Sequence, residues 1–259
     1  MAKLFVFGLG YSATRIAALL EVAGWRTEAT GSAGTVAFED DAAVREALGR
    51  ASHVLSSIPP GDAGDPVLAR YGDALPGRWL GYLSSTGVYG DTGGAWVDES
   101  VPAGGGRRLA RVEADARWLG RGARVFRLPG IYGPGRSALD RVRAGIAHRI
   151  DMPGQVFSRI HVDDIAGGVA AALAAEVPPG AYNLADDEPA SQNAVIGEAC
   201  RLLGMPPPPL QTLEAAGLGS EARGFYAENR RVANGKLKRL AGWRPRFADY
   251  REGLAMLAR

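Results

Sequence analysis

Short apolar runs alternate with segments of helical periodicity along the chain. Residues 4–7 (Leu-Phe-Val-Phe) form an uninterrupted apolar run, which is typical of a strand buried on both faces. Similar runs predict strands at 25–30, 36–38, 53–58, 79–84, 123–128 and 181–185. Helical spacing predicts helices from residue 13 to Gly24 and at 42–48, 66–75, 107–119, 137–147, 165–175, 191–203, 234–242 and 250–257. This alternation predicts an α/β fold with a doubly wound parallel sheet.

The first strand runs directly into a glycine turn, Gly8-x-Gly10-x-x-Ala13. Strand, glycine turn and helix in this order favour a dinucleotide-binding Rossmann fold. Gly8 allows the tight turn, Gly10 lets a pyrophosphate approach the backbone, and Ala13 keeps the helix close to the strand. Tyr11 and Ser12 stand at the helix start, where free N–H groups face an anion. The alternative is a tight turn without a ligand.

The end of the second predicted strand bears on the choice of cofactor. In this fold an acid at that position bonds the ribose hydroxyls of NAD. Here the strand ends in Thr30-Gly31-Ser32, and Glu28 lies in mid-strand. The absence of an acid favours NADP over NAD, although no Arg follows to bind the 2′-phosphate. Either cofactor, NADP or NAD, is compatible with the sequence.

Two further strand ends are candidates for the cofactor site. Ser56, Ser57, Ile58 and Pro59 follow a strand that ends beside the switch point of a doubly wound sheet, so they could cover the adenosine side. A rigid surface turn is the alternative for this segment. Ser84 ends another buried strand, at the sheet edge where open α/β folds place their chemistry.

Composition narrows the class of protein. The chain has 259 residues and a net charge of +2, with 30 basic and 28 acidic residues dispersed along it, so neither nucleic acid nor membrane is expected as its partner. Cys200 is the one cysteine, no metal site is expected, and a reducing, cytoplasmic location fits. Lys occurs at positions 3, 236 and 238 alone.

Several motifs together resemble the extended short-chain dehydrogenase/reductase family, which contains NAD-dependent epimerases and dehydratases. The match is carried by the glycine turn, Ser84-Ser-Thr-Gly-Val-Tyr-Gly90, Arg127-Leu-Pro-Gly-Ile-Tyr-Gly-Pro-Gly135, His161-Val-Asp-Asp-Ile165 and the ending around Asn234–Trp243. The resemblance implies an NAD(P)-binding Rossmann domain and a small C-terminal lobe for substrate. We expect the first to comprise 1–135, completed by about 160–185, and the second to comprise 136–159 and 186–259.

The resemblance also implies roles for individual residues. Ser85 matches the Ser/Thr that hydrogen-bonds the reacting oxygen, and Pro129 matches the segment that lies along the nicotinamide. Arg136 and Arg159 fall where the family meets its substrate or closes the lobe. His161 is expected to be a structural imidazole rather than a base.

The departures from the family are as informative as the matches. The usual proton donor is a Tyr with a Lys four residues later, and no Tyr-x-x-x-Lys occurs in this chain. Phe7 also stands where many extended members have the first glycine of the turn. Tyr89 and Tyr132 are weak substitutes for the catalytic Tyr, because family members keep them as structural residues. The chain resembles small bacterial proteins described as NAD-dependent epimerase/dehydratase-like.

Two functions therefore remain open at the level of sequence. The first is an NAD(P)-dependent oxidoreductase or epimerase that acts on a small polar substrate. The second is a non-catalytic NAD(P)-binding sensor or scaffold. A retained fold with a degenerate cofactor site is a third alternative. The substrate, the turnover and the oligomeric state are not predicted.

Overall fold

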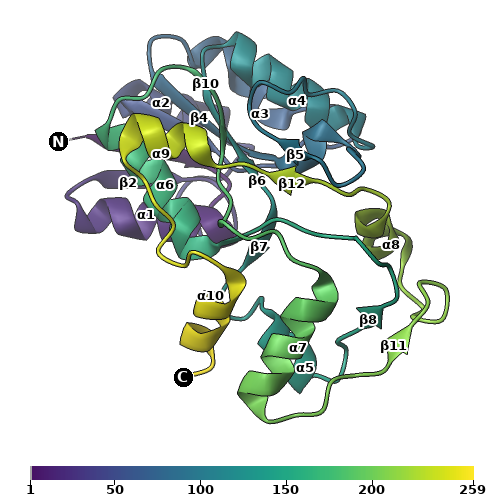
Figure 1. Ribbon diagram of the computed structural model, residues 1–259. Helices are drawn as coiled ribbons and strands as arrows, with labels where there is room; N and C mark the ends of the chain where they lie inside the picture. The colour runs from purple at the N-terminus through teal and green to yellow at the C-terminus, as the bar shows by residue number, and fades with distance from the viewer. Residues whose placement is uncertain (1) are drawn as a thin grey trace.

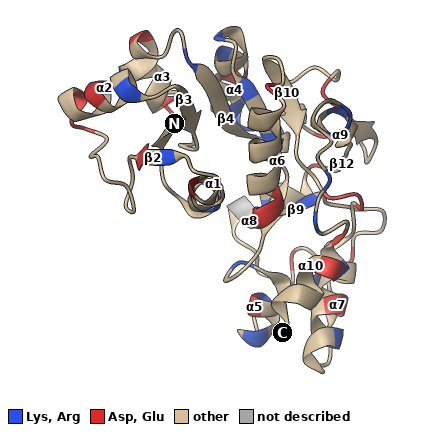
Figure 2. Cartoon of the chain, turned by 90° about the vertical axis from the view of Figure 1, so that its left-hand side faces the viewer, with Lys and Arg blue, Asp and Glu red and all other residues tan. Residues whose placement is uncertain are grey.

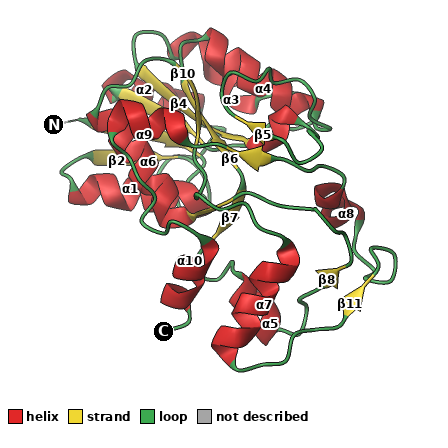
Figure 3. Ribbon diagram, viewed as in Figure 1, coloured by secondary structure: helices red, strands yellow, loops and turns green. Residues whose placement is uncertain are grey.

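The computed structural model describes residues 2–259, with the side chain of Glu221 excepted. A six-stranded parallel sheet lies at its centre, in the order β10-β6-β4-β3-β1-β2 (Figures 1 and 3). Its strands are β1 (Lys3–Phe7), β2 (Arg26–Ala29), β3 (His53–Ser56), β4 (Trp79–Ser85), β6 (Arg124–Leu128) and β10 (Gly180–Asn183). The order reverses between β1 and β3, so the predicted doubly wound Rossmann architecture is confirmed.

Ten α-helices and two short 3₁₀ helices are assigned within the described residues. The α-helices are α1 (Tyr11–Val22), α2 (Asp41–Arg50), α3 (Pro66–Tyr71), α4 (Leu109–Gly120), α5 (Ala138–Arg143), α6 (Val162–Ala174), α7 (Gln192–Leu203), α8 (Ser220–Tyr226), α9 (Gly235–Ala241) and α10 (Tyr250–Leu257). The 3₁₀ helices are η1 (Gly72–Ala74) and η2 (Thr86–Tyr89). Three parallel pairs of short strands complete the fold: β5 (Trp96–Val97) with β12 (Arg231–Val232), β7 (Gly130–Tyr132) with β9 (Arg159–His161), and β8 (Arg149–Ile150) with β11 (Leu210–Gln211).

The apolar run of β1 is explained by the two layers that cover the sheet. Leu4 and Val6 belong to one core cluster, with residues of α1, α6 and α9. Phe5 and Phe7 belong to a second cluster, with residues of α2, α3 and α4. Successive side chains of a strand point to opposite faces, so a strand between two helical layers needs apolar residues at every position.

A third core lies below the sheet, where α5, α7 and α10 pack together (Figure 1). Leu139, Ile196 and Leu254 form its buried centre. The segment around Leu237 and Trp243, however, packs with the sheet layer and not with this third core. The division into a Rossmann domain and a C-terminal lobe stays a prediction. The segment around Leu237 and Trp243 packs with the sheet, so it would be counted with the Rossmann domain and not with the lobe.

Several element boundaries differ from the predictions. The strand at 36–38 is a single bridge between Thr30 and Val36. The predicted helix 107–119 begins at Leu109, and the side chain of this residue is exposed although it is apolar. The predicted helix 137–147 stops at Arg143. The two helix errors lie at element ends, where contacts distant in sequence decide whether helical bonding continues.

The helix predicted at 165–175 begins earlier, at Val162, and His161 is its cap. The His161 ring accepts a hydrogen bond from the backbone N–H of Asp163. Asp164 instead accepts hydrogen bonds from the backbone N–H groups of Arg246 and Phe247, which fastens the segment before α10 to α6.

Charges of both signs lie on the same elements, for example on α2 and α5 (Figure 2). Among the described residues, no helix combines the length and the apolar composition needed to cross a bilayer.

Candidate functional site

The glycine turn after β1 is held by contacts that the sequence did not specify. Gly8 has φ of 83° and donates its N–H to Thr30 Oγ1 at 3.0 Å. Leu9 donates its N–H to the carbonyl oxygen of Thr30 at 2.7 Å, and the Ser57 hydroxyl donates to the carbonyl oxygen of Gly8. A Cβ on Gly8 would lie 2.7 Å from Ile58 Cγ1, so glycine is required here by conformation and by space.

Gly10 has a different role from Gly8. It is the N-cap of α1, and no side chain caps the free N–H groups of that helix. A Cβ built on Gly10 would meet no atom within 4 Å, so the space in front of this residue is open. Uncapped N–H groups facing open space are the geometry that a phosphate occupies at a helix start.

The open space belongs to a cleft of about 740 Å³. It runs from the glycine turn, past the carboxyl ends of β4 and β6, to α5, α7 and α8. Predicted site residues that line it are Gly10, Tyr11, Ser12, Ala13, Ser57, Pro59, Ser84, Ser85, Pro129, Arg136 and Arg159. Predicted site residues outside its lining are Gly8, Thr30, Gly31, Ser32, Ser56, Ile58, Tyr89 and Tyr132.

Ser85 presents its hydroxyl to the cleft. Its Oγ accepts a hydrogen bond from the Gly87 N–H at 3.1 Å, which caps η2 and orients the side chain. The hydroxyl proton is then available to a ligand oxygen. Ser84, the preceding residue, donates instead to the buried carboxylate of Asp115 at 2.6 Å.

Tyr89 lies outside the cleft, within a buried polar network. Its hydroxyl donates to Asn183 Oδ1 at 2.8 Å and accepts from Arg127 Nη1 at 3.0 Å. Burial raises the pKa of the Tyr89 phenol, although Arg127 opposes that rise. Both bonds tie the hydroxyl to the sheet and not to a ligand, so the position is structural in this fold.

Tyr132 is also buried away from the cleft. Its ring packs edge-on against His161, with centroids 5.2 Å apart. Its hydroxyl lies against α10, because a Cβ built on Gly253 would come within 2.2 Å of it. Burial raises the pKa of the Tyr132 phenol further from neutrality. Neither Tyr89 nor Tyr132 is therefore brought together with Ser85.

The tyrosines that do line the cleft are Tyr11 and Tyr226. Tyr226 ends α8, and its ring packs edge-on against Phe157 at 5.4 Å. Sequence reasoning missed this residue, because the segment between 210 and 232 carries no motif of the family. Burial raises the pKa of the Tyr226 phenol.

Arginine side chains give the cleft a positive lining. These residues are Arg107, Arg108, Arg111, Arg136, Arg141, Arg159 and Arg230, and His148 lies among them. Among the described residues of the lining, Glu228 is the one carboxylate. A cleft with this imbalance attracts anionic ligands.

The two arginines predicted to bind substrate differ in burial and in the hydrogen bonds that they make. Arg159 is buried and donates to the carbonyl oxygens of Phe157 and Ala190, both at 2.8 Å, and to Gln192 Oε1 at 3.1 Å. Arg136 is exposed, and its guanidinium lies 5.8 Å from the centre of the Tyr11 ring, beside the glycine turn.

Within residues 2–259 no group of three or more His, Cys, Asp or Glu side chains is arranged to hold a metal ion.

No family model matches the sequence. The curated protein YeeZ of Escherichia coli is 31% identical over 146 residues, and the chain spans about half the length of this relative (51%) and of its counterpart in strain O157:H7. A solved structure of a conserved protein of unknown function from Silicibacter pomeroyi is 40% identical, with a TM-score of 0.87 over 100% of this chain and 98% of that chain. The chain belongs to the family of this Silicibacter protein.

More distant structures have the same fold. A dTDP-glucose 4,6-dehydratase from Bacillus anthracis, solved in complex with NAD, is 14% identical, with a TM-score of 0.77 over 100% of this chain and 96% of that chain. The human epimerase family protein SDR39U1, solved with NADPH, is 16% identical, with a TM-score of 0.78 over 99% of each chain. The predicted fold of the extended short-chain dehydrogenases/reductases is thereby confirmed.

Proposed function

We propose that this protein binds NAD or NADP in the cleft and acts on a small polar substrate as an oxidoreductase or epimerase of the extended short-chain dehydrogenase/reductase type. The observation that carries the proposal is the continuous cleft that joins the open helix start at Gly10 to the hydroxyl of Ser85. Structures of the same fold contain NAD or NADPH, which supports the choice of cofactor.

The lining residues fit such a dinucleotide. The pyrophosphate would lie against Gly10 and the N–H groups at the start of α1, with Ser57 and Pro59 toward the adenosine side. Pro129 would lie along the nicotinamide, which supplies hydride transfer when bound. Ser85 would donate its hydroxyl proton in a hydrogen bond to the substrate oxygen, and Arg136 and Arg159 would meet the substrate.

A non-catalytic sensor or scaffold that binds NAD(P) is the second candidate. The observation that favours it is the position of Tyr89 and Tyr132, which lie outside the cleft in a chain that lacks Tyr-x-x-x-Lys. A missing general acid typically lowers a rate by ~10²–10⁴, so such a protein would turn over ordinary carbonyl substrates slowly.

Calorimetry with NAD, NADP and their reduced forms tests cofactor binding. The Gly10→Val side chain would project into open space, so the variant should keep its fold by circular dichroism and lose dinucleotide binding. Gly49→Val is the matched control, because Gly49 is exposed on α2 with no atom within 4 Å of an added Cβ. Unchanged affinity in Gly10→Val would remove the cofactor site from this turn.

Turnover separates the two candidates once binding is established. Ser85→Ala should leave cofactor affinity unchanged and sharply reduce turnover of any accepted substrate. Tight cofactor binding without turnover across a panel of hydroxy and carbonyl compounds would favour the sensor.

A further inference from the structure

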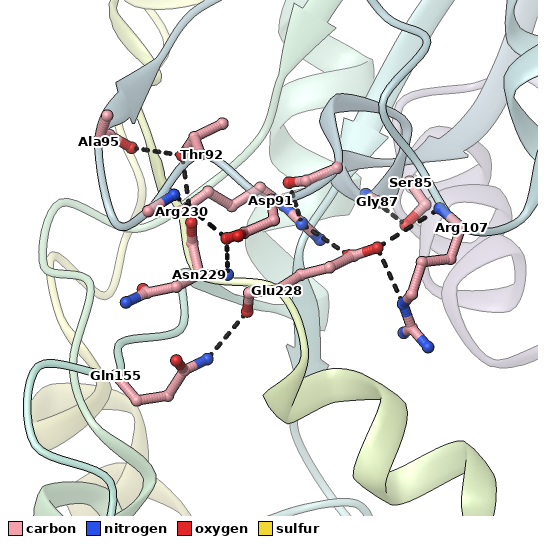
Figure 4. Close-up of polar contacts among 12 residues, drawn as sticks. Ser85, Gly87, Asp91, Thr92, Ala95, Arg107, Gln155, Glu228, Asn229 and Arg230 are labelled. Atoms are coloured by element: carbon pink, nitrogen blue, oxygen red, sulfur yellow. Dashed lines mark hydrogen bonds and ion pairs between the residues drawn. The ribbon is translucent and has the colours of Figure 1, made fainter.

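Arg230 lies beside Ser85 although the two residues are far apart in the sequence. A Cβ built on Gly87 would be 3.2 Å from Ser85 Oγ and 3.9 Å from Arg230 Nη2, so both groups border the same small space. Arg230 and Ser85 both line the cleft, and Figure 4 shows the Arg230 side chain reaching from its own segment toward Gly87 and Ser85.

Of the two terminal nitrogens of the Arg230 guanidinium, Nη1 is held by hydrogen bonds and Nη2 makes none within the described residues. Nη1 donates to Glu228 Oε2 at 2.7 Å and to the carbonyl oxygen of Gly90 at 2.6 Å (Figure 4). Within the part of the chain that the structure describes, Nη2 makes no hydrogen bond. The fixed nitrogen therefore orients a second donor group toward the space beside Ser85.

Two arginines share the carboxylate of Glu228. Glu228 accepts from Arg230 and also from Arg107 Nε at 3.0 Å, so one carboxylate serves two guanidinium groups. The Glu228 and Arg230 side chains are 9% and 16% exposed. Burial works against the charged form of Glu228, but the hydrogen bonds from Arg230 and Arg107 outweigh it and hold the pKa of that carboxyl below its ordinary value. Asp91 is a further acid near Arg230, but within the described residues neither carboxylate accepts from Arg230 Nη2, so this donor can meet an additional anion.

The neighbours of Arg230 attach this segment to the rest of the protein, and Arg230 Nη2 takes no part in these bonds. The neighbouring Asn229 donates its N–H to Asp91 Oδ1 at 2.8 Å, and its carbonyl oxygen accepts from the Thr92 N–H at 3.1 Å. Arg231 donates to the carbonyl oxygen of Gly94. These bonds hold the segment to the loop before β5. They do not use Arg230 Nη2, so this nitrogen could donate to a ligand.

We propose that Ser85 Oγ and Arg230 Nη2 form a subsite for an anionic ligand, in which Arg230 Nη2 bonds an oxygen of a carboxylate or phosphate group and the one Ser85 proton bonds a neighbouring oxygen of the same ligand. Two groups that border the space can donate to an anion, namely the Ser85 hydroxyl and Arg230 Nη2. The subsite rests on the proposed function in one respect alone, namely that the ligand is the substrate of the cofactor-dependent reaction. The substrate is then a small organic acid or a phosphate ester held next to Ser85.

Isothermal calorimetry at constant ionic strength tests the subsite, with oxalate and inorganic phosphate as probes. Arg230→Gln should weaken binding of the preferred probe by at least about tenfold, which is the usual effect of losing a charge-assisted hydrogen bond. Arg231→Gln removes the same charge one residue away, outside the cleft lining, and should change affinity by less than about threefold. Tighter binding of oxalate identifies a carboxylate, and tighter binding of phosphate identifies a phosphate.

Wild-type affinity in Arg230→Gln, or equal losses in both variants, would overturn the proposal, as would the absence of any probe binding. Ser85→Ala gives an independent reading if Arg230→Gln does not fold, and it should also weaken the probe. The Gly10→Val variant separates this subsite from the cofactor site. Probe binding that persists in Gly10→Val and needs Arg230 supports the subsite even if NAD(P) does not bind, which would count against the proposed function alone.

Discussion

The two glycines of the first turn have separate physical roles. Gly8 is required by a positive φ and by the contact with Ile58, so its role is within the fold. Gly10 has extended backbone angles and open space in front of it, so the fold itself does not require glycine there. The structure therefore separates a glycine that the turn needs from one for which a role in cofactor binding is proposed.

The predicted preference for NADP over NAD rests on single residues after β2. Gly31, the predicted discriminating position, has φ of 108°, and a Cβ on it would lie 2.9 Å from the Leu9 N–H nitrogen. An Asp at this position would therefore strain the turn, so Gly31→Asp is not a clean test. Ser32 is exposed next to it and is the better place for a charge.

We expect NADP to bind at least as tightly as NAD, because β2 is followed by Thr30-Gly31-Ser32 and not by an acid. Ser32→Asp should shift the preference toward NAD by placing a carboxylate near the 2′-phosphate. Competition calorimetry with both cofactors measures the ratio, with Ser32→Asn as the uncharged control. A wild type that prefers NAD by about tenfold, or ~1.4 kcal/mol, would contradict the assignment.

At the scale of elements, a buried network joins α4 to the carboxyl ends of β4 and β6. The Arg127 guanidinium donates to both oxygens of Asp115, at 2.7 and 3.1 Å, and both side chains are buried. Ser84 adds a third hydrogen bond to the same carboxylate. The network holds the strand ends that carry Ser84 and Ser85, so it positions this part of the cleft lining.

Asp115→Ala should destabilise the protein by ~3–5 kcal/mol, because it leaves the buried Arg127 guanidinium without a counter-charge. Urea unfolding measures the loss. Glu46→Ala is the control, since Glu46 forms an exposed pair with Arg50 on α2 and should cost less than ~1 kcal/mol. Similar losses in both variants would show that burial does not set the strength of the Asp115 pair.

At the scale of the whole molecule, Asp186 lies where the sheet body meets the segment that leads into α10. Its N–H donates to the carbonyl oxygen of Arg159, and the N–H of Asp187 donates to that of Ala248. Burial raises the pKa of the Asp186 carboxyl to about 8, while the positive charge of Arg159 opposes that rise and Asp187 and Asp249 add to it. The folded protein then holds a proton here that the unfolded chain releases near pH 4.

Since the folded state binds this proton more tightly, stability attributable to Asp186 falls as pH rises from about 4 to 8. Asp186→Asn keeps the shape of the protonated acid and removes the titration. Above pH 8 the variant should be more stable than the wild type by about 1–2 kcal/mol, or roughly 2–8 °C in Tm, with a smaller difference at pH 5. Thermal unfolding across this range checks the slope, and parallel wild-type and variant curves would contradict the assignment.

The sequence alone was sufficient for the fold class and for the glycine turn. Both depend on local information: apolar runs such as residues 4–7 require burial on two faces, and a positive φ at Gly8 requires glycine. Motifs close to the sheet also placed Ser85 and Pro129 in the lining of the cleft.

Which side chains line the cleft was decided by the tertiary structure. Tyr89 follows a sheet strand, as a site residue would, yet its hydroxyl is bound by Asn183 and Arg127, which are distant in sequence. Arg230 and Tyr226 come from a segment with no recognisable motif, and backbone bonds attach that segment to the loop before β5. Local pattern specifies which elements form, whereas contacts between distant segments specify which side chains share one space.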